Sequence, residues 1–190
     1  EFDEYYTPYY LLIDLLEKIN KIDGIERIRL GSIEPLMITD EFCDRARKIE
    51  KLCHHFHLSL QSGCDETLRR MNRKYTTSEF ENVVQLLRNT YKDVILTTDI
   101  IVGFPGETDE EFEDTLDVVE KVKFEQVYMF IYSRRVGTPG DRMENQVQEE
   151  QKHKRFDKLK ALVESQIAEN NQKYVGTVQK VLVEGTSKNN

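Results

Sequence analysis

One acidic side chain stands inside an apolar run, where a predicted strand passes into a loop and then a helix. The run, residues 98–108, reads Thr-Asp-Ile-Ile-Val-Gly-Phe-Pro-Gly-Glu-Thr, and the acid is Asp99. Burying a carboxylate is costly unless it is hydrogen-bonded or bound to a ligand. Because α/β proteins bind ligands at the carboxyl ends of their strands, we interpret Asp99 as a ligand contact.

Polar and aromatic side chains mark one face of each strand predicted at residues 55–61, 94–103 and 126–132. Strand residues alternate between two faces, and in each of these strands one face is apolar and suits covering helices. The opposite face carries His55, His57, Ser59 and Gln61, then Thr97, Asp99 and Ile101, then Gln126, Tyr128, Phe130 and Tyr132. We interpret these faces as the lining of one space that holds a polar ligand with an aromatic component. The alternative is an open sheet with one face in water, which is uncommon for parallel strands.

A fourth strand is predicted at residues 27–33, and it leaves the direction of Glu34 open. Strict alternation groups Glu34 with the apolar Ile28 and Leu30. A bulge near Gly31, or the end of the strand, must therefore decide where this carboxylate points.

The cysteines and histidines do not predict a metal site. Cys43, Cys53 and Cys64 have a spacing that fits neither a C-x-x-C zinc site nor a cluster-binding loop. His55 and His57 share a strand face, but no carboxylate or third ligand is near them in the sequence. We predict reduced, structural cysteines in an intracellular protein.

Helices alternate with the strands along most of the chain. They are predicted at residues 8–20, 39–52, 65–71, 76–89, 109–122 and 147–172. Thr76 with Glu79, and Thr108 with Glu111, have the spacing of a capping box. This order predicts an α/β fold with about four parallel strands. Residues 174–184 alternate like a further strand, so a separate small β-domain is predicted from residue 173 onward.

Composition narrows the possible functions. The 190 residues carry a net charge of −8, which argues against electrostatic wrapping of nucleic acid by the whole chain. Basic residues nevertheless cluster at Arg69, Arg70, Arg134 and Arg135, which are candidates for contact with an anionic partner.

No apolar stretch approaches the ~20 residues that span a bilayer, so we expect a cytoplasmic protein without a membrane anchor. The first residue is Glu1, which suggests a piece of a longer protein.

Four segments together resemble the radical S-adenosylmethionine (radical SAM) methylthiotransferases. They are Ser-Ile-Glu-Pro at residues 32–35, Ser-Leu-Gln-Ser-Gly at 59–63, Met-Asn-Arg-Lys-Tyr at 71–75, and Asp-Ile-Ile-Val-Gly-Phe-Pro-Gly-Glu-Thr at 99–108. The resemblance covers nearly the whole chain from about residue 8. It implies a partial TIM-like (β/α) radical SAM barrel over residues 1–172, and the truncated start of an RNA-binding TRAM domain over residues 173–190.

The resemblance also implies a cofactor site. Glu34 and Asp99 match positions that bind the ribose of SAM, Gln61 matches a strand-end amide beside the methionine part, and Arg73 matches the group near its carboxylate. Ile101 and Phe130 match the two walls of the adenine. These roles agree with the chemistry of the side chains, because vicinal hydroxyls donate to carboxylates and a guanidinium pairs with a carboxylate. Plain structural roles are the alternative for Gln61, Arg73 and Phe130.

The family's C-x-x-x-C-x-x-C loop, which binds a 4Fe–4S cluster, is absent from this sequence. The resemblance therefore implies a fragment that lacks the cluster ligands and does not turn over alone, while the complete enzyme uses SAM and 4Fe–4S clusters.

Within the family, residues 27–35 and 55–65 look most like the branch that methylthiolates C2 of threonylcarbamoyladenosine next to the tRNA anticodon. One alternative is methylthiolation of isopentenyladenosine in tRNA, or of a ribosomal protein. Another is a non-catalytic RNA-binding module that keeps the barrel.

Overall fold

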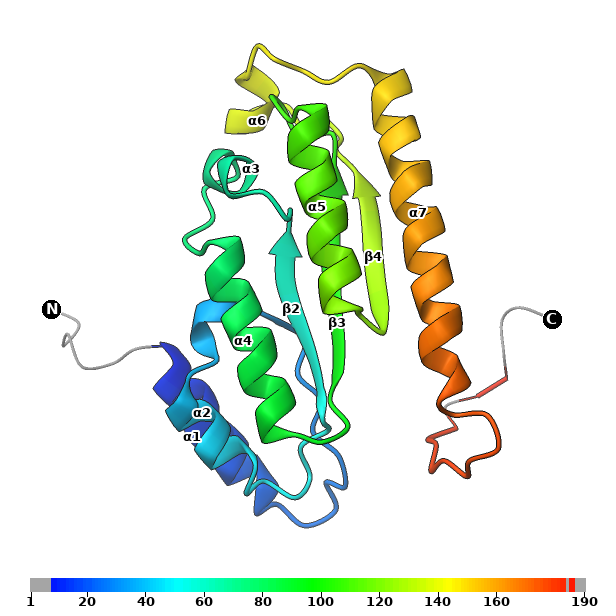
Figure 1. Ribbon diagram of the computed structural model, residues 1–190. Helices are drawn as coiled ribbons and strands as arrows, with labels where there is room; N and C mark the ends of the chain where they lie inside the picture. Colours follow the sequence, from blue (N-terminus) through cyan, green and yellow to red (C-terminus); the bar gives the residue numbers. More distant parts are fainter. Residues whose placement is uncertain (1–7, 184, 187–190) are drawn as a thin grey trace, which may run out of the picture.

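Four parallel strands form one sheet in the order in which they occur along the chain. The computed structural model describes residues 8–183 and 185–186. The strands are β1 (Ser32–Ile33), β2 (His55–Gln61), β3 (Ile95–Val102) and β4 (Gln126–Ile131). In Figure 1, α4 (Thr77–Thr90) and α5 (Asp109–Val122) cover one face of the sheet, and α7 (Glu149–Gln172) runs alongside β4. The predicted α/β class, with parallel strands and helices, is confirmed.

The remaining helices are α1 (Pro8–Asn20), the 3-10 turn η1 (Pro35–Met37), α2 (Asp40–Ala46), α3 (Asp65–Arg70) and α6 (Pro139–Arg142). The helix starts follow from side-chain caps. Thr76 and Thr108 each accept a hydrogen bond from the backbone N–H three residues on, and both capping boxes are complete. The hydroxyl of Thr39 accepts from the N–H of Phe42 at 3.1 Å, which starts α2 as predicted.

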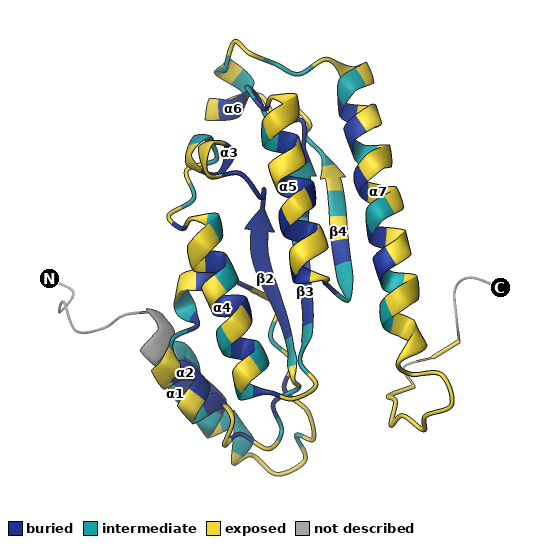
Figure 2. Cartoon of the chain, in the orientation of Figure 1, coloured by how far each residue is buried: buried dark blue, intermediate teal, exposed yellow. Residues whose placement is uncertain are grey.

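The hydrophobic core lies between the sheet and its helices. Phe56, Leu58 and Leu60 of β2 are fully buried, as are Leu96 and Ile100 of β3. Figure 2 shows β2 buried along nearly its whole length, whereas β4 has a single buried residue, Val127, and is otherwise partly or fully exposed. The apolar faces predicted from alternation are thus the faces that pack against the helices.

The predicted strand at residues 27–33 is mostly wrong. Ile28 makes a single parallel bridge to Leu52, and regular pairing starts again only at Ser32 opposite His57. Between these two pairings, residues 28–32 advance by four positions and residues 52–57 by five, so the extra residue lies in the neighbouring segment and not at Gly31.

The helix predicted to reach residue 52 ends at Ala46 instead. Beyond it, tight turns of the i to i+3 type bring Ile49 and Leu52 into the core. These turns bury the same apolar residues whose spacing suggested a longer helix.

The strand predicted at residues 174–184 is not formed over residues 174–183, and Glu184 lies outside the described residues. Val178 and Val183 of this segment are exposed. A strand needs a neighbouring backbone to complete its hydrogen bonds, and the described chain offers none here. The assignment of residues 173–190 to a TRAM domain stays a prediction. Within the described ranges, no helix is long and apolar enough to cross a membrane.

Candidate functional site

A cavity of about 600 Å³ lies at the carboxyl ends of β2, β3 and β4. We call it the strand-end cavity. It is lined by five of the six residues predicted to contact a ligand, namely Gln61, Arg73, Asp99, Ile101 and Phe130. These residues come from three strands and the loop between α3 and α4, so the fold brings together side chains that are far apart in the sequence.

The sixth predicted residue, Glu34, does not line the strand-end cavity. It directly precedes η1, and one of its carboxylate oxygens (Oε1) accepts a hydrogen bond from Arg73 Nη1 at 2.5 Å. The prediction gave Glu34 and Arg73 separate ligand contacts, whereas the structure pairs them with each other.

The backbone at Gln61 bends sharply where β2 ends. Its φ of 68° lies in the left-handed region, which a residue with a side chain rarely adopts. The pairing of β2 with β3 shifts register between Leu58 and Gln61. The buried hydroxyl of Tyr75 fixes this bend by donating to the carbonyls of Ser59 and Leu60, and burial raises the pKa of Tyr75. The bend directs Gln61 into the strand-end cavity.

Asp99 has a partner that sequence reasoning missed. Its Oδ2 lies 3.1 Å from Nε2 of His57, and Nδ1 of His57 lies 2.9 Å from the hydroxyl of Thr97. The signal was present, because His57 and Asp99 were both assigned to the inward face of adjacent strands. Asp99 is distant from His57 in the sequence, so a search among the sequence neighbours of the histidines does not find this contact.

A second cavity of about 460 Å³ adjoins the first, and we call it the histidine cavity. His55, His57 and Tyr128 line it, and it shares Asp99 and Phe130 with the strand-end cavity. Tyr128 and Phe130 are 45% and 52% exposed, so the inward face of β4 offers open aromatic surface.

The loop after β3, residues 103–108, is held by a buried ion pair. We call it the glycine loop. Glu107 accepts hydrogen bonds from the N–H of Gly103 and from Arg155 of α7, each at 2.7 Å. The side chains of Glu107 and Arg155 are only 1% and 5% exposed. Burial raises the pKa of Glu107, and these two hydrogen bonds act against that rise.

Two further contacts fix the glycine loop. Gly103 has a φ of +75°, and a Cβ built on it would lie 2.4 Å from Cγ of the buried Lys152. The N–H of Gly106 donates to the carbonyl of Asn145 at 2.7 Å. The loop is therefore a rigid wall beside the strand-end cavity, fastened mainly by α7, a role that sequence reasoning did not assign to that helix.

The basic residues suggested for an anionic partner are mostly engaged in ion pairs. Arg70 pairs with Glu111 of α5, Arg69 with the neighbouring Glu66, and Arg134 with Asp141. Arg135 lines the strand-end cavity and makes none of the ion pairs found within the described chain. It is the best placed of the four for a further anion.

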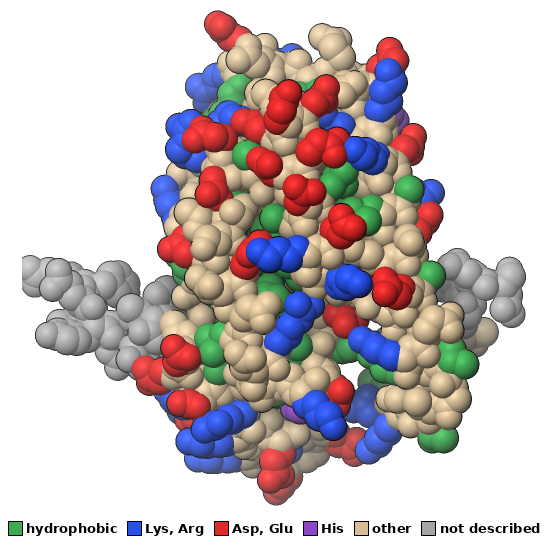
Figure 3. Space-filling model, viewed as in Figure 1, with side chains coloured by type: hydrophobic (Ala, Val, Ile, Leu, Met, Phe, Trp, Pro, Cys, Tyr) green, Lys and Arg blue, Asp and Glu red, His purple; other side chains and the backbone are tan. Residues whose placement is uncertain are grey.

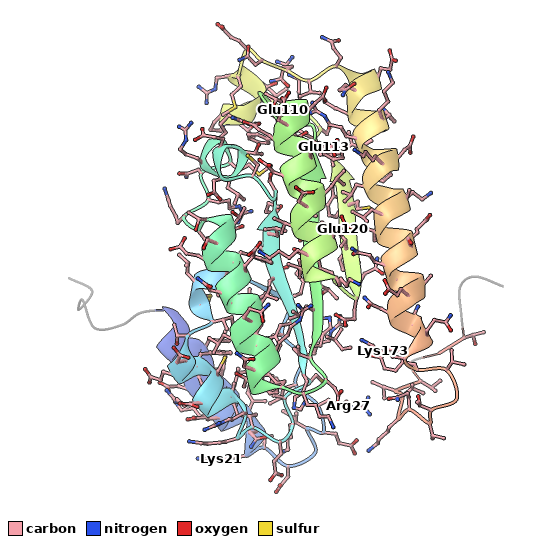
Figure 4. All side chains as sticks on the ribbon, in the orientation of Figure 1. Lys21, Arg27, Glu110, Glu113, Glu120 and Lys173 are labelled. Carbon is pink, nitrogen blue, oxygen red and sulfur yellow. The ribbon has the colours of Figure 1, made fainter. Side chains whose placement is uncertain are left out.

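The outward surface has a different character. Figure 3 shows acidic side chains concentrated over α5, and Figure 4 shows Glu110, Glu113 and Glu120 projecting from that helix away from the sheet. Glu113 is paired with Lys158 of α7. A polyanion would meet repulsion here, so the helix-covered face suits solvent rather than nucleic acid.

The cysteines do not form the ligand set of an iron–sulfur cluster. Cys43 lies in α2, Cys53 precedes β2, and Cys64 precedes α3. Burial raises the pKa of the Cys43 and Cys64 thiols, which disfavours the thiolate that binds metal. In the part of the chain that the structure describes, no three His, Cys, Asp or Glu residues are grouped to hold a metal ion.

Parallel strands, covering helices and ligand-type residues at the strand ends place the chain among the α/β proteins that bind ligands at the carboxyl ends of their strands. The chain resembles coproporphyrinogen III oxidase (HemN) from Escherichia coli, described as a radical SAM enzyme, with a TM-score of 0.69 and 18% identity over 85% of this chain and 38% of that one. Methylornithine synthase (PylB) has a TM-score of 0.59 and 15% identity, over 84% and 45% of the two chains. Residues 3–119 match the model of the radical SAM superfamily. The chain therefore belongs to the radical SAM superfamily.

Several curated proteins are more similar to this chain in sequence than those two structures are, and their name is more specific. The chain is 50% identical, over 183 residues, to the tRNA-2-methylthio-N(6)-dimethylallyladenosine synthase of Caldicellulosiruptor saccharolyticus, and 48% identical, over 177 residues, to that of Acetivibrio thermocellus. These alignments cover 96% and 93% of this chain, but only 38% and 37% of the relatives. The chain thus spans about two fifths of the length of these curated relatives.

Proposed function

We propose that this chain is part of a radical SAM enzyme that adds a methylthio group to dimethylallyladenosine, also called isopentenyladenosine, in tRNA. The names of the relatives support this substrate. It replaces the sequence-based preference for threonylcarbamoyladenosine, because no relative described above carries that name. Isopentenyladenosine, the alternative substrate inferred from the sequence, is therefore the better supported one.

The observation that carries the proposal is the convergence of five ligand-type residues on the strand-end cavity. Asp99 would accept hydrogen bonds from the ribose hydroxyls of SAM, and Ile101 and Phe130 would hold the adenine. Arg73 would pair with the methionine carboxylate, and Gln61 would contact the methionine part. Glu34 does not line the cavity and one of its oxygens is paired with Arg73, so we rank it below Asp99.

The cavity suits such a cofactor in volume and in chemistry. It combines a carboxylate with three guanidinium groups, and it holds two buried polar atoms, Arg70 Nε and Tyr132 Oη, that have no hydrogen-bond partner within the described chain. Bound SAM and a 4Fe–4S cluster would supply the radical chemistry in the complete enzyme. The described cysteines do not fit the cluster, so we assign this chain the binding and orientation of SAM alone.

Nucleoside analysis of tRNA tests the substrate. A strain that lacks the gene for the complete protein is expected to lose 2-methylthio-isopentenyladenosine and to keep isopentenyladenosine. Return of the modified nucleoside on re-expression of the complete protein, but not of an Asp99→Ala variant, would link the loss to this site. An unchanged level in the deletion strain would refute the proposal.

Threonylcarbamoyladenosine is the second candidate, and the segments at residues 27–35 and 55–65 favour it. The same tRNA digest distinguishes the two. Loss of the methylthiolated threonylcarbamoyl nucleoside, with the isopentenyl one intact, would assign the enzyme to this second substrate. If neither nucleoside changed, the RNA-binding module without catalysis would gain support.

A further inference from the structure

The polar side chains on the inward face of β2 and β3 form one continuous row of contacts. Nε of Arg29 lies 3.3 Å from Nδ1 of His55, and Nε2 of His55 lies 3.3 Å from the hydroxyl of Thr97. The hydroxyl of Thr97 lies 2.9 Å from Nδ1 of His57, whose Nε2 lies 3.1 Å from Oδ2 of Asp99. Parallel pairing of His57 with Thr97 sets this spacing.

When both histidines are neutral, the contact between Arg29 Nε and His55 Nδ1 gives this row one direction. Arg29 has only donors, so Nδ1 of His55 accepts and its Nε2–H donates to Thr97. The hydroxyl of Thr97 then donates to Nδ1 of His57, and Nε2–H of His57 donates to the carboxylate of Asp99. Burial and the nearby Arg29 lower the pKa of His55, in agreement with a neutral ring. A second guanidinium nitrogen of Arg29 also lies 3.3 Å from Nε2 of His55, a contact that cannot form together with this direction.

The row ends on the carboxylate that borders both cavities. His57 is buried and its ring lies 5.6 Å from that of Tyr128, so the imidazole has little freedom to turn. Oδ2 of Asp99 is engaged by this ring, and no hydrogen bond from the described chain reaches Oδ1. His57 therefore fixes Oδ2 of Asp99, while the Asp99 side chain remains 25% exposed.

We propose that His57 and Thr97 are positioning residues that hold the Asp99 carboxylate with one oxygen presented to a ligand hydroxyl in the strand-end cavity. Thr97 sets the tautomer of His57, and His57 sets the orientation of Asp99. The identity of the ligand as the ribose of SAM rests on the proposed function, whereas the tautomer does not.

Two matched variants separate hydrogen bonding from packing. Thr97→Val keeps the shape of the side chain and removes the hydroxyl, whereas Thr97→Ser keeps the hydroxyl. Long-range ¹H–¹⁵N NMR of the chain is expected to show the Nε2–H tautomer of His57 in the wild type and in Thr97→Ser, and a tautomer mixture in Thr97→Val. A wild-type His57 protonated at Nδ1 or at both nitrogens would overturn the inference, and so would a Thr97→Val spectrum like that of the wild type.

Ligand binding gives the second readout. Thr97→Val is expected to weaken SAM binding by about threefold to tenfold, less than the loss of a whole charge-assisted hydrogen bond, and Thr97→Ser to restore it. Affinity for a 2′,3′-dideoxy analogue of SAM should be the same in all three proteins. Equal weakening of both ligands by Thr97→Val would indicate a packing role and overturn the inference.

The two proposals fail in distinguishable ways. If the wild type bound neither ligand, the proposed function would be overturned together with the ligand named here. A wrong tautomer alongside normal SAM binding would overturn only the positioning role.

Discussion

Two carboxylates of the segment 98–108 differ in burial and in the number of hydrogen bonds that they accept. Glu107 has almost no exposed surface, and its partners are a backbone N–H and a buried guanidinium. Asp99 is a quarter exposed, and the side chain that pairs with it among the described residues is His57, which reaches a single oxygen. The two acids lie in the same short segment, but only Asp99 retains an oxygen for a ligand.

The difference shows how to separate a structural acid from a binding one. Glu107 has its partners within the protein, and it fastens the glycine loop to α7. Asp99 keeps hydrogen-bonding capacity at the edge of two cavities. A carboxylate that is held on one side and open on the other is arranged for a ligand.

The largest effect is expected from Glu107→Ala. It removes the buried one of the two carboxylates that pair with Arg155 and leaves the N–H of Gly103 without its acceptor, which we expect to cost about 3–5 kcal/mol of unfolding free energy. Urea denaturation measures this change. Asp109→Ala is the matched control, because Asp109 also contacts Arg155 but has a largely exposed side chain, and it should stay close to wild type. A small loss for Glu107→Ala would mean that the ion pair does not hold the loop.

Asp99→Ala should have the opposite profile. We expect SAM binding to weaken by about 1.5–3 kcal/mol, roughly tenfold to a hundredfold, as for the loss of a charge-assisted hydrogen bond. Unfolding free energy should change much less than in Glu107→Ala. Titration calorimetry measures the affinity, and the exposed Asp93→Ala controls for net charge. Unchanged affinity would remove Asp99 from the site.

Gly103→Ala tests how firmly the loop is fixed. The positive φ and the contact with Lys152 together should cost about 1–3 kcal/mol of stability. Gly137→Ala is the matched control, since its φ is +90° and nothing lies within 4 Å of the added Cβ. The difference between the two variants isolates the collision with Lys152, and equal losses would show that the loop yields easily.

The smallest effect concerns the row behind Asp99. The pKa of His55 is lowered on folding, so the unfolded chain binds more protons as the pH falls through the ordinary histidine value of about 6.5. Its contribution to stability is therefore present above that value and lost below it. His55→Gln should reduce the decrease in unfolding free energy between pH 7.5 and pH 5.5, whereas the exposed His153→Gln should not. The same decrease in both variants would contradict a neutral His55.

Alternation and capping signals were sufficient to predict most of the fold. They located β2, β3 and β4, the inward faces and the starts of α4 and α5, because local sequence sets these features. The short β1 and the early end of α2 escaped prediction, since irregular turns can bury Ile49 and Leu52 as well as a helix can. The partners of Asp99, Glu107 and Glu34 also escaped, because each lies on an element distant in sequence.

The substrate preferred from the sequence is less well supported than its alternative, for a related reason. Residues 27–35 and 55–65 were used to choose between family branches, yet side chains at the end of the first segment serve the fold. Ile33 is buried, Pro35 starts η1, and Glu34 pairs with Arg73. Because these residues have structural roles, their identity carries little information about which tRNA nucleoside is the substrate.

The left-handed backbone of Gln61 has a consequence for the evolution of this protein. Glycine would adopt that conformation without strain, so selection for stability alone would favour replacing Gln61. The replacement would relax the strand end and remove an amide from the strand-end cavity. Keeping a glutamine there means accepting a less stable chain in exchange for a side chain at that place.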